Sequence, residues 1–217
     1  MATSGTYAID YDIAEFVDES FERCGIDPAT LTARHTRSAR RSLNLMFADW
    51  ANEGVLLFAV DEQTQTLTSA LVSYSVPTGT LAILEGVLRR DGIDTPVHRI
   101  SREMYHLIPN KTNGGLPTQL YLDRKAGTYY LWNAPDNSTD VLRYWRLRRI
   151  QDVTAAAETA DVPYRWFEAL AAGLAEKLAV KFAPDRLSVL AGLSAKAYQR
   201  AKTEDRERGD LKFGVGW

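Results

Sequence analysis

The 217-residue sequence has little of what metal and redox chemistry requires, with one cysteine and three histidines. A single cysteine, Cys24, excludes an intrachain disulfide and fits a reducing compartment. No two of His35, His98 and His106 have the i, i+4 spacing of a helical zinc site. We therefore expect no metal site and no cofactor, and we expect Cys24 to be a small buried apolar residue.

Motifs of the common enzyme classes are also missing. The sequence has no Gly-x-Ser-x-Gly nucleophile elbow, no Gly-x-x-x-x-Gly-Lys phosphate loop and no Gly-x-Gly-x-x-Gly dinucleotide turn. Its adjacent carboxylates, such as Asp18 and Glu19, are better explained by a solvated helix face than by glycoside hydrolysis, which needs two carboxyls across a cleft. The prediction is a protein without catalytic residues, and not an enzyme.

Long hydrophobic runs and a strong charge of one sign are absent as well. The longest apolar run, residues 55–60, is too short to span a membrane, and residues 1–10 do not have the pattern of a signal peptide. The 26 basic and 28 acidic residues nearly balance, so the composition does not require nucleic acid as a partner. We expect no membrane association, and a chain that stays in the aqueous cytosol until it joins a larger assembly.

Apolar residues at helical spacing predict helices at both ends of the chain. Residues 10–24 form an amphipathic helix with an acidic outer face. A second helix starts after Asp27-Pro28, or alternatively near Thr32, and ends before Gly54. Its first half is basic, which suggests that the two helices are antiparallel neighbours with complementary charge. Two more helices follow Pro163, with a break at Pro184.

The middle of the chain changes to strand-like patterns separated by turn residues. A short helix is expected at residues 101–107, where Ser101 can cap the first turn. The expected strand-like segments are residues 55–60, 65–72, 81–88, 118–123, 128–133 and 140–150. The turn chemistry between the last three predicts an antiparallel meander.

These elements predict an α+β fold in three parts. Residues 10–54 and 162–208 would form a discontinuous, four-helix bundle-like domain from the N- and C-terminal helix pairs. Residues 55–161 would form an inserted antiparallel β-rich region. Residues 209–217 would form an extended C-terminal tail, in which Leu211, Phe213, Val215 and Trp217 alternate with polar residues or glycine. A strand with one apolar face needs a partner sheet or groove.

One strand-like segment is rich in arginine and aromatic residues. It contains Arg143, Arg146, Arg148 and Arg149, interleaved with Tyr144, Trp145 and Leu147. One interpretation is a basic surface for nucleic acid or for an acidic partner subunit. The other is a solvated strand whose arginine stems pack on the aromatic rings. The pattern alone leaves both open.

Several segments, in collinear order from about Tyr11 to Arg208, resemble one protein family. They are ARRSLNLMFADW (39–50), NEGV (52–55), IPNKT (108–112), GLPTQ (115–119), LWNAPD (131–136), LRYWRLRRIQD (142–152) and DVPYRW (161–166). The family is the head-to-tail adaptor proteins of tailed bacteriophages, also called head completion proteins, tail accessory factors or tail tubular protein A. No single segment is specific, and the resemblance depends on their order.

The resemblance implies a structural virion protein at the neck, assembled in the host cytoplasm. Such adaptors form a twelve-fold ring beneath the portal protein, close the DNA-filled head and provide a platform for the next component, which is a stopper, a nozzle or a tail tube. One relative has been linked to cell-wall hydrolysis. The alternatives are therefore a nucleic-acid-binding assembly factor and, less favoured, a peptidoglycan hydrolase.

The resemblance also implies roles for particular residues. The portal-binding candidates are Leu211, Lys212, Phe213, Val215 and Trp217. The candidates for the tail side or a subunit interface are Lys111, Asn113, Pro135 and Asp136. The arginines Arg143, Arg146, Arg148 and Arg149 would line subunit contacts or the channel that holds genomic DNA.

Overall fold

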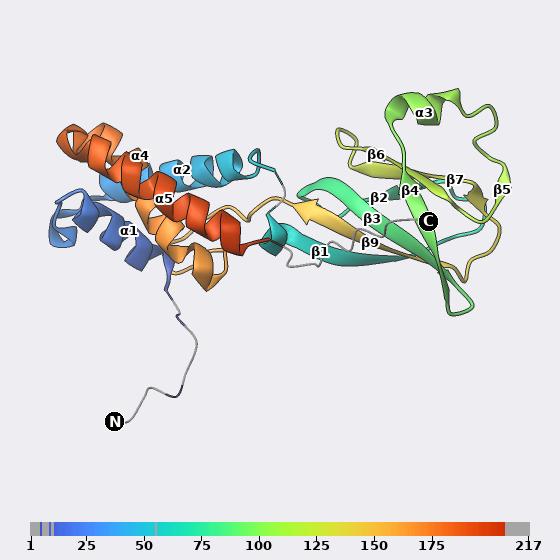
Figure 1. Ribbon diagram of the computed structural model, residues 1–217, viewed down its shortest axis with the longest axis horizontal. Coiled ribbons are helices and arrows are strands. Elements are labelled where there is room, and N and C mark those ends of the chain that lie inside the picture. The colour runs from blue at the N-terminus through green and yellow to red at the C-terminus, as the bar shows by residue number, and fades with distance from the viewer. Residues whose placement is uncertain (1–4, 6–8, 10, 55, 207–217) are drawn as a thin grey trace, which may run out of the picture. The chain divides into compact units, whose positions relative to one another are not determined.

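The chain forms two compact units in a computed structural model that describes residues 5, 9, 11–54 and 56–206 (Figure 1). The helical unit combines Met1–Phe58 with Ile150–Trp217, and the β unit is Ala59–Arg149. The predicted tail, residues 209–217, lies outside the described residues, and so do all five portal-binding candidates.

The first helix of the helical unit, α1 (Ile13–Arg23), has strong end signals. The backbone N–H of Glu15 donates to Asp12 Oδ1, and the backbone N–H of Asp12 donates to Glu15 Oε2, both at 2.9 Å. This reciprocal pair is a capping box, which satisfies two amides that the helix leaves open. Gly25 follows the helix with φ of 76°, a conformation that glycine adopts without strain and that ends the helix.

The other helices of this unit begin where proline and polar residues predicted breaks. Pro28 opens only a 3-10 turn, η1 (Pro28–Thr30), so α2 (Ala33–Trp50) begins after Thr32, the later of the two predicted starts. The remaining turns and helices are η3 (Tyr164–Trp166), α4 (Phe167–Phe182), η4 (Pro184–Arg186) and α5 (Leu187–Glu204), while η2 (Leu57–Ala59) spans the boundary with the β unit. The predicted break at Pro184 is thus confirmed.

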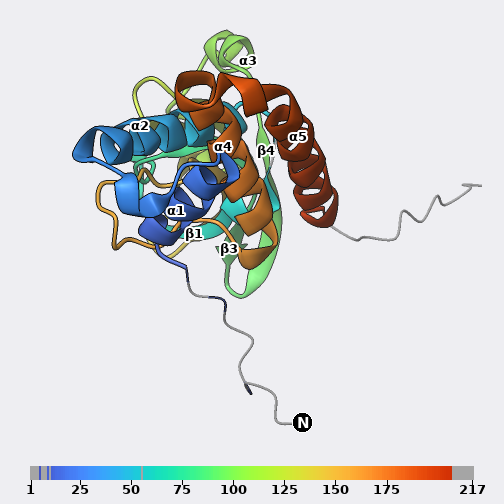
Figure 2. The same ribbon diagram turned by 90° about the vertical axis from the view of Figure 1, so that its left-hand side faces the viewer.

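Helix α4 lies at the centre of the helical unit, and α1, α2 and α5 each pack against it (Figures 1 and 2). It is rich in alanine and buried on most sides, which lets three neighbours approach closely. Helix α1 also forms an ion pair with α4, in which Arg23 Nη1 donates to Glu168 Oε1 at 2.8 Å. Helices α1 and α2 meet at the rings of Phe21 and His35, which are 5.6 Å apart.

The close packing around α4 predicts opposite effects for two helical glycines. A Cβ added at Gly173 would lie 2.7 Å from Met46 Sδ, whereas one added at Gly192 in α5 would have no atom within 4 Å. Gly192→Ala should raise the free energy of unfolding by about 0.5–1 kcal/mol, the usual gain from replacing helical glycine. Gly173→Ala should lower it by about 1 kcal/mol, because overpacking exceeds that gain. Urea unfolding of both variants tests this, and equal stabilities would contradict it.

The β unit is built on a curled seven-stranded sheet (Figure 1). Its strands are β1 (Val60–Thr66), β2 (Ser73–Ser75), β3 (Thr80–Arg90), β4 (Ile93–Arg99), β6 (Gln119–Asp123), β7 (Thr128–Trp132) and β9 (Val141–Arg148). Their order in space is β1-β9-β3-β4-β6-β7-β2. Two short strands, β5 (Gly114–Gly115) and β8 (Ala134–Pro135), pair separately in parallel.

The predicted meander is wrong in its order. Strands β6 and β7 do form an antiparallel pair, but β9 lies between β1 and β3 instead of beside β7. Strands β4 and β6 run parallel, with His98 opposite Gln119. A parallel pair needs a long connection, and here that connection contains α3 (Arg102–Leu107). The predicted cap of α3 is confirmed, since Ser101 Oγ accepts from the backbone N–H of Met104 at 3.1 Å.

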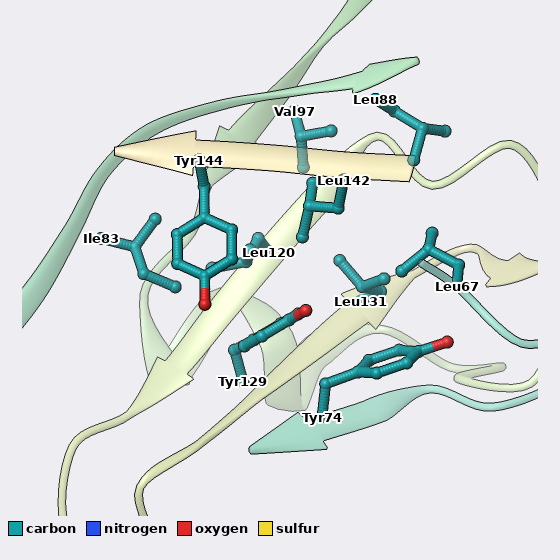
Figure 3. Close-up of a cluster of buried hydrophobic side chains, with 10 residues drawn as sticks. All are labelled: Leu67, Tyr74, Ile83, Leu88, Val97, Leu120, Tyr129, Leu131, Leu142 and Tyr144. Atoms are coloured by element: carbon teal, nitrogen blue, oxygen red, sulfur yellow. The ribbon is translucent and has the colours of Figure 1, made fainter. Parts of the chain in front are cut away.

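The β unit has a hydrophobic core of its own. Its buried side chains are Leu67, Tyr74, Ile83, Leu88, Val97, Leu120, Tyr129, Leu131, Leu142 and Tyr144 (Figure 3). Tyr129 and Leu131 of β7 are fully buried, and the ring of Tyr129 stacks on Tyr74 with centroids 5.5 Å apart. A unit with such a core does not depend on the helices to bury its apolar side chains.

The predicted α+β class is correct, but the predicted architecture is wrong. The described residues form five α-helices and a large curled sheet, not a four-helix bundle with an inserted β-rich region. Apolar periodicity identified the four long helices, but it could not show that three of them surround a single buried helix. It also could not show that the sheet mixes parallel and antiparallel pairs.

Candidate functional site

The arginine-rich strand is β9, and neighbouring strands provide partners for its charges. Arg146 has a side chain only 9% exposed, on the same face as Leu142 and Tyr144. Its Nε and Nη2 donate to the two carboxylate oxygens of Asp61 in β1, at 2.6 and 3.0 Å. This guanidinium also holds the pKa of the Asp61 carboxyl below its usual range. Arg146 is therefore a buried structural residue of the sheet.

The remaining β9 candidates differ in how they are held. Arg143 Nε donates to Glu62 Oε1 at 2.6 Å, and Arg148 Nε lies 3.8 Å from an oxygen of Asp61. The side chain of Arg149 is exposed. Contact of these arginines with DNA or another subunit stays a prediction, and Arg149 is the most accessible of the four.

Two loops predicted for tail-side contact lie side by side in the β unit, although they are far apart in the sequence. The pairing of β5 with β8 joins them, and Asn113 Nδ2 donates to Asn133 Oδ1 at 3.1 Å. Lys111 Nζ donates to the carbonyl oxygen of Ile108 at 2.9 Å, which fastens the first loop to the end of α3. The structure thus brings these candidates into one region.

The second loop has a buried and an exposed candidate. Pro135 is buried, and its carbonyl oxygen accepts from the backbone N–H of Ala70 at 2.8 Å. Asp136 is exposed and forms an ion pair with Arg90 of β3. Pro135 therefore shapes the loop, and Asp136 is the side chain available to a partner.

Helix α3 presents apolar side chains that the sequence analysis did not identify. Met104 and Leu107 are 56% and 70% exposed, and they lie three residues apart on one helix face. Beneath them, Tyr105 is buried and stacks on Tyr121, with ring centroids 5.3 Å apart. Exposed apolar side chains on a rigid base are typical of protein interfaces. The three-residue spacing of Met104 and Leu107 in this six-residue helix is the sequence signal that could have identified them.

The open face of the sheet has a second such feature at Trp145, which is 42% exposed. This side chain lines a groove of about 550 Å³ formed by residues of β1, β3, β4 and β9. Gly86 also lines this groove, and a Cβ added there would lie 3.2 Å from Tyr144 Cβ, so glycine lets β3 and β9 approach closely. A half-exposed tryptophan in a groove is a frequent anchor for a protein partner.

Cys24 and His35, considered earlier for reactivity and metal binding, make hydrogen bonds to the backbone. Cys24 is buried as predicted, its Sγ donates to the carbonyl oxygen of Ala175 at 3.4 Å, and burial raises the pKa of its thiol. His35 Nδ1 accepts from the backbone N–H of Thr32 at 3.1 Å, at the start of α2. In the part of the chain that the structure describes, no group of three or more His, Cys, Asp or Glu side chains could hold a metal ion.

Both units expose apolar side chains, Met104 and Trp145 in the β unit and Val180 and Val189 in the helical unit, and such side chains are typical of surfaces that bind other proteins. The family model described as SU10 adaptor protein matches residues 11–212, so the chain belongs to the SU10 adaptor protein family. A comparison with curated proteins gives no match.

The family is one of phage head-to-tail adaptors, and the predicted resemblance is confirmed. The chain is therefore a structural bacteriophage protein and a component of the virion. None of the helices among the described residues combines the length and apolarity needed to cross a membrane.

Proposed function

We propose that the chain forms a ring beneath the portal at the neck of the virion, closes the DNA-filled head and provides the platform for the tail. The observation that carries this proposal is that the family match spans both compact units, so both belong to the adaptor. An adaptor between two assemblies needs a separate binding surface for each. A ring of twelve copies matches the portal symmetry that the family implies.

We assign the portal contact to the C-terminal tail and the next component to the β unit. The alternation of Leu211, Phe213, Val215 and Trp217 supports insertion of the tail as a strand or into a groove. The adjacent loops containing Asn113 and Asp136, together with exposed Met104 and Leu107 of α3, support contact of the β unit with a stopper, a nozzle or a tail tube.

Light scattering after size-exclusion chromatography tests the ring. The chain alone should elute as a monomer, and addition of the portal ring should produce a complex with one adaptor per portal subunit. A chain that never joins the portal ring would show that the proposal is wrong.

Truncation after Arg208 tests the assignment of the tail. The truncated chain should keep its circular dichroism spectrum and melting temperature, because the described residues of both units end at Arg206. Its affinity for the portal should fall at least about tenfold, since the loss of several apolar anchors costs more than about 1.4 kcal/mol. A matched pair of full-length variants refines the test. Serine at the four apolar positions should reproduce the loss, whereas Asp210→Ser, outside the portal-binding candidates, should not. Unchanged portal affinity on truncation would place the interface elsewhere.

A further inference from the structure

The exposed face of α2 carries arginines that have no acidic partner in the part of the chain that the structure describes. Arg34, Arg37 and Arg41 are spaced by three and four residues and share one face, which Leu45 continues at 67% exposure. Within the described residues, none of the three arginines forms an ion pair, and Arg37 bonds only the carbonyl oxygen of Ala33 in its own helix, at 3.2 Å. We call these four side chains the arginine face. Its exposed leucine favours a protein partner over a nucleic-acid backbone.

A nearby lysine adds to the positive charge of the arginine face. Lys181 Nζ of α4 donates to Ser42 Oγ at 2.6 Å. Burial and the charge of Arg41 lower the pKa of Lys181, so the cations at this place repel each other. Carboxylates from a partner would relieve that repulsion.

The same unit has a groove of opposite charge between α1 and the start of α4. It has a volume of about 490 Å³ and an aromatic floor, where the rings of Phe16 and Phe167 are 5.0 Å apart and Tyr11 is 47% exposed. Its rim carries five carboxylates, from Glu15, Asp18, Glu19, Glu22 and Glu168. We call it the acidic groove.

The charge of the acidic groove is only partly compensated. Arg23, the one cation among the described residues that line it, pairs with Glu19 at 2.7 Å and with Glu168 at 2.8 Å. Asp18 and Glu22 are exposed and, over residues 11–54 and 56–206, have no ion pair. Among the described residues, the groove thus offers carboxylates without ion pairs around apolar rings, and the arginine face offers guanidinium groups without ion pairs around an apolar side chain.

We propose that the arginine face of one copy docks into the acidic groove of the next copy around the ring. Leu45 would cover the aromatic floor, and the arginines would pair with Asp18 and Glu22. In a ring each copy offers its arginine face to one neighbour and receives the other neighbour's arginine face in its acidic groove, which is a head-to-tail contact, the kind that closes cyclic assemblies. The inference rests on the proposed ring and adds which surfaces of the subunits meet.

Charge reversal with mixing tests the contact. One variant carries Arg34→Glu, Arg37→Glu and Arg41→Glu, and the other carries Asp18→Lys and Glu22→Lys. A control reverses three exposed cations of the β unit, with Arg102→Glu, Arg124→Glu and Lys125→Glu. Association between copies is measured by sedimentation velocity, for the chain alone at high concentration and with the portal ring, and circular dichroism checks folding.

Each reversal variant alone should associate about a hundredfold more weakly than the wild type, because like charges then face each other. An equimolar mixture should regain most of the association, since every contact between the two variants again joins opposite charges. The control should behave as the wild type. The proposal is overturned if folded reversal variants associate normally, if their mixture stays dissociated, or if wild-type copies associate neither alone nor on the portal.

The outcomes separate this contact from the proposed function. If the reversal variants form rings on the portal as well as the wild type does, the proposed ring is supported and the proposed contact between copies is wrong. Copies that associate through this contact but never bind the portal would support the contact and contradict the proposed ring beneath the portal. If the arginine variant loses only the ability to retard a short DNA duplex, with association unchanged, the partner is nucleic acid and the proposal is wrong.

Discussion

Arg90→Met is expected to lower the free energy of unfolding by about 3 kcal/mol, the usual effect of leaving a buried charge unpaired. The side chain of Asp140 is fully buried, and Arg90 Nε donates to its Oδ1 at 2.9 Å while Arg90 Nη2 donates to its Oδ2 at 2.6 Å. Methionine keeps much of the volume of the arginine stem but removes both donors. Urea unfolding at neutral pH measures the difference.

The neighbouring residue provides a matched control for this variant. Arg89 also pairs with an aspartate, Asp94, but both side chains are exposed, at 43% and 38%. Solvent and counterions screen such a pair, so Arg89→Met should leave the free energy of unfolding nearly unchanged. Equal effects of the two substitutions would mean that burial of Asp140 is not what makes its pair important.

The pH dependence of stability should change in Arg90→Met as well. Arg90 holds the pKa of the Asp140 carboxyl below its usual range. A carboxyl with a lowered pKa in the folded state contributes stability above its unfolded pKa of about 3.9, and this contribution is lost as the pH falls through the folded pKa. The Arg90→Met variant lacks this contribution, so its stability should fall less steeply than that of the wild type on acidification below that value.

Arg146→Met is the second substitution expected to have a large effect, again a loss of about 3 kcal/mol. Arg146 Nη1 donates to Thr80 Oγ1 at 2.9 Å and to the carbonyl oxygen of Pro77 at 3.2 Å, in addition to the bonds with Asp61. The substitution removes all of these bonds, and of the two neutral acceptors only the Pro77 oxygen keeps a donor within the described residues, Thr80 Oγ1 at 2.6 Å. The matched control is Arg149→Met, whose exposed side chain predicts a change within about 0.5 kcal/mol.

The Arg146 result bears directly on tests of DNA binding. If both Arg146 and Arg149 variants are equally stable, β9 does not depend on the buried ion pair. If Arg146→Met is destabilised as expected, loss of DNA retardation in that variant would report unfolding and not contact. Arg149→Met is then the informative substitution for any role of β9 near the genome.

The helices were predictable from the sequence because their signals are local. The capping residues Asp12 and Ser101, and the prolines at 28, 163 and 184, mark helix starts and breaks within a few residues of where they act. What surrounds each helix is not local. The central position of α4 depends on packing with α1 and α2, which are more than a hundred residues away in the chain.

The sheet was less predictable for the same reason. Strand β4 contains Pro96 and has mostly exposed side chains, so its sequence lacks the alternation that indicates a strand. The inner face of β9 was hard to recognise from the sequence because it carries Arg146. The partner of this arginine, Asp61, comes from a strand some eighty residues earlier. The neighbouring loops at Asn113 and Asn133 are likewise joined only by the folded sheet.

The pairing of early with late elements in both units has a consequence for the timing of folding during synthesis. In the β unit, the first strand, β1, pairs with the last strand, β9. In the helical unit, the early helices α1 and α2 pack on the late helix α4. The first elements of each unit therefore cannot be covered until a late element has been synthesised. At about 5–20 residues per second, the apolar sides of α1 and α2 remain uncovered for roughly ten seconds after they leave the ribosome. The β unit, which lies between them and α4 in the chain, can therefore finish folding before the helical unit does. A subunit able to assemble exists only once translation has passed α4.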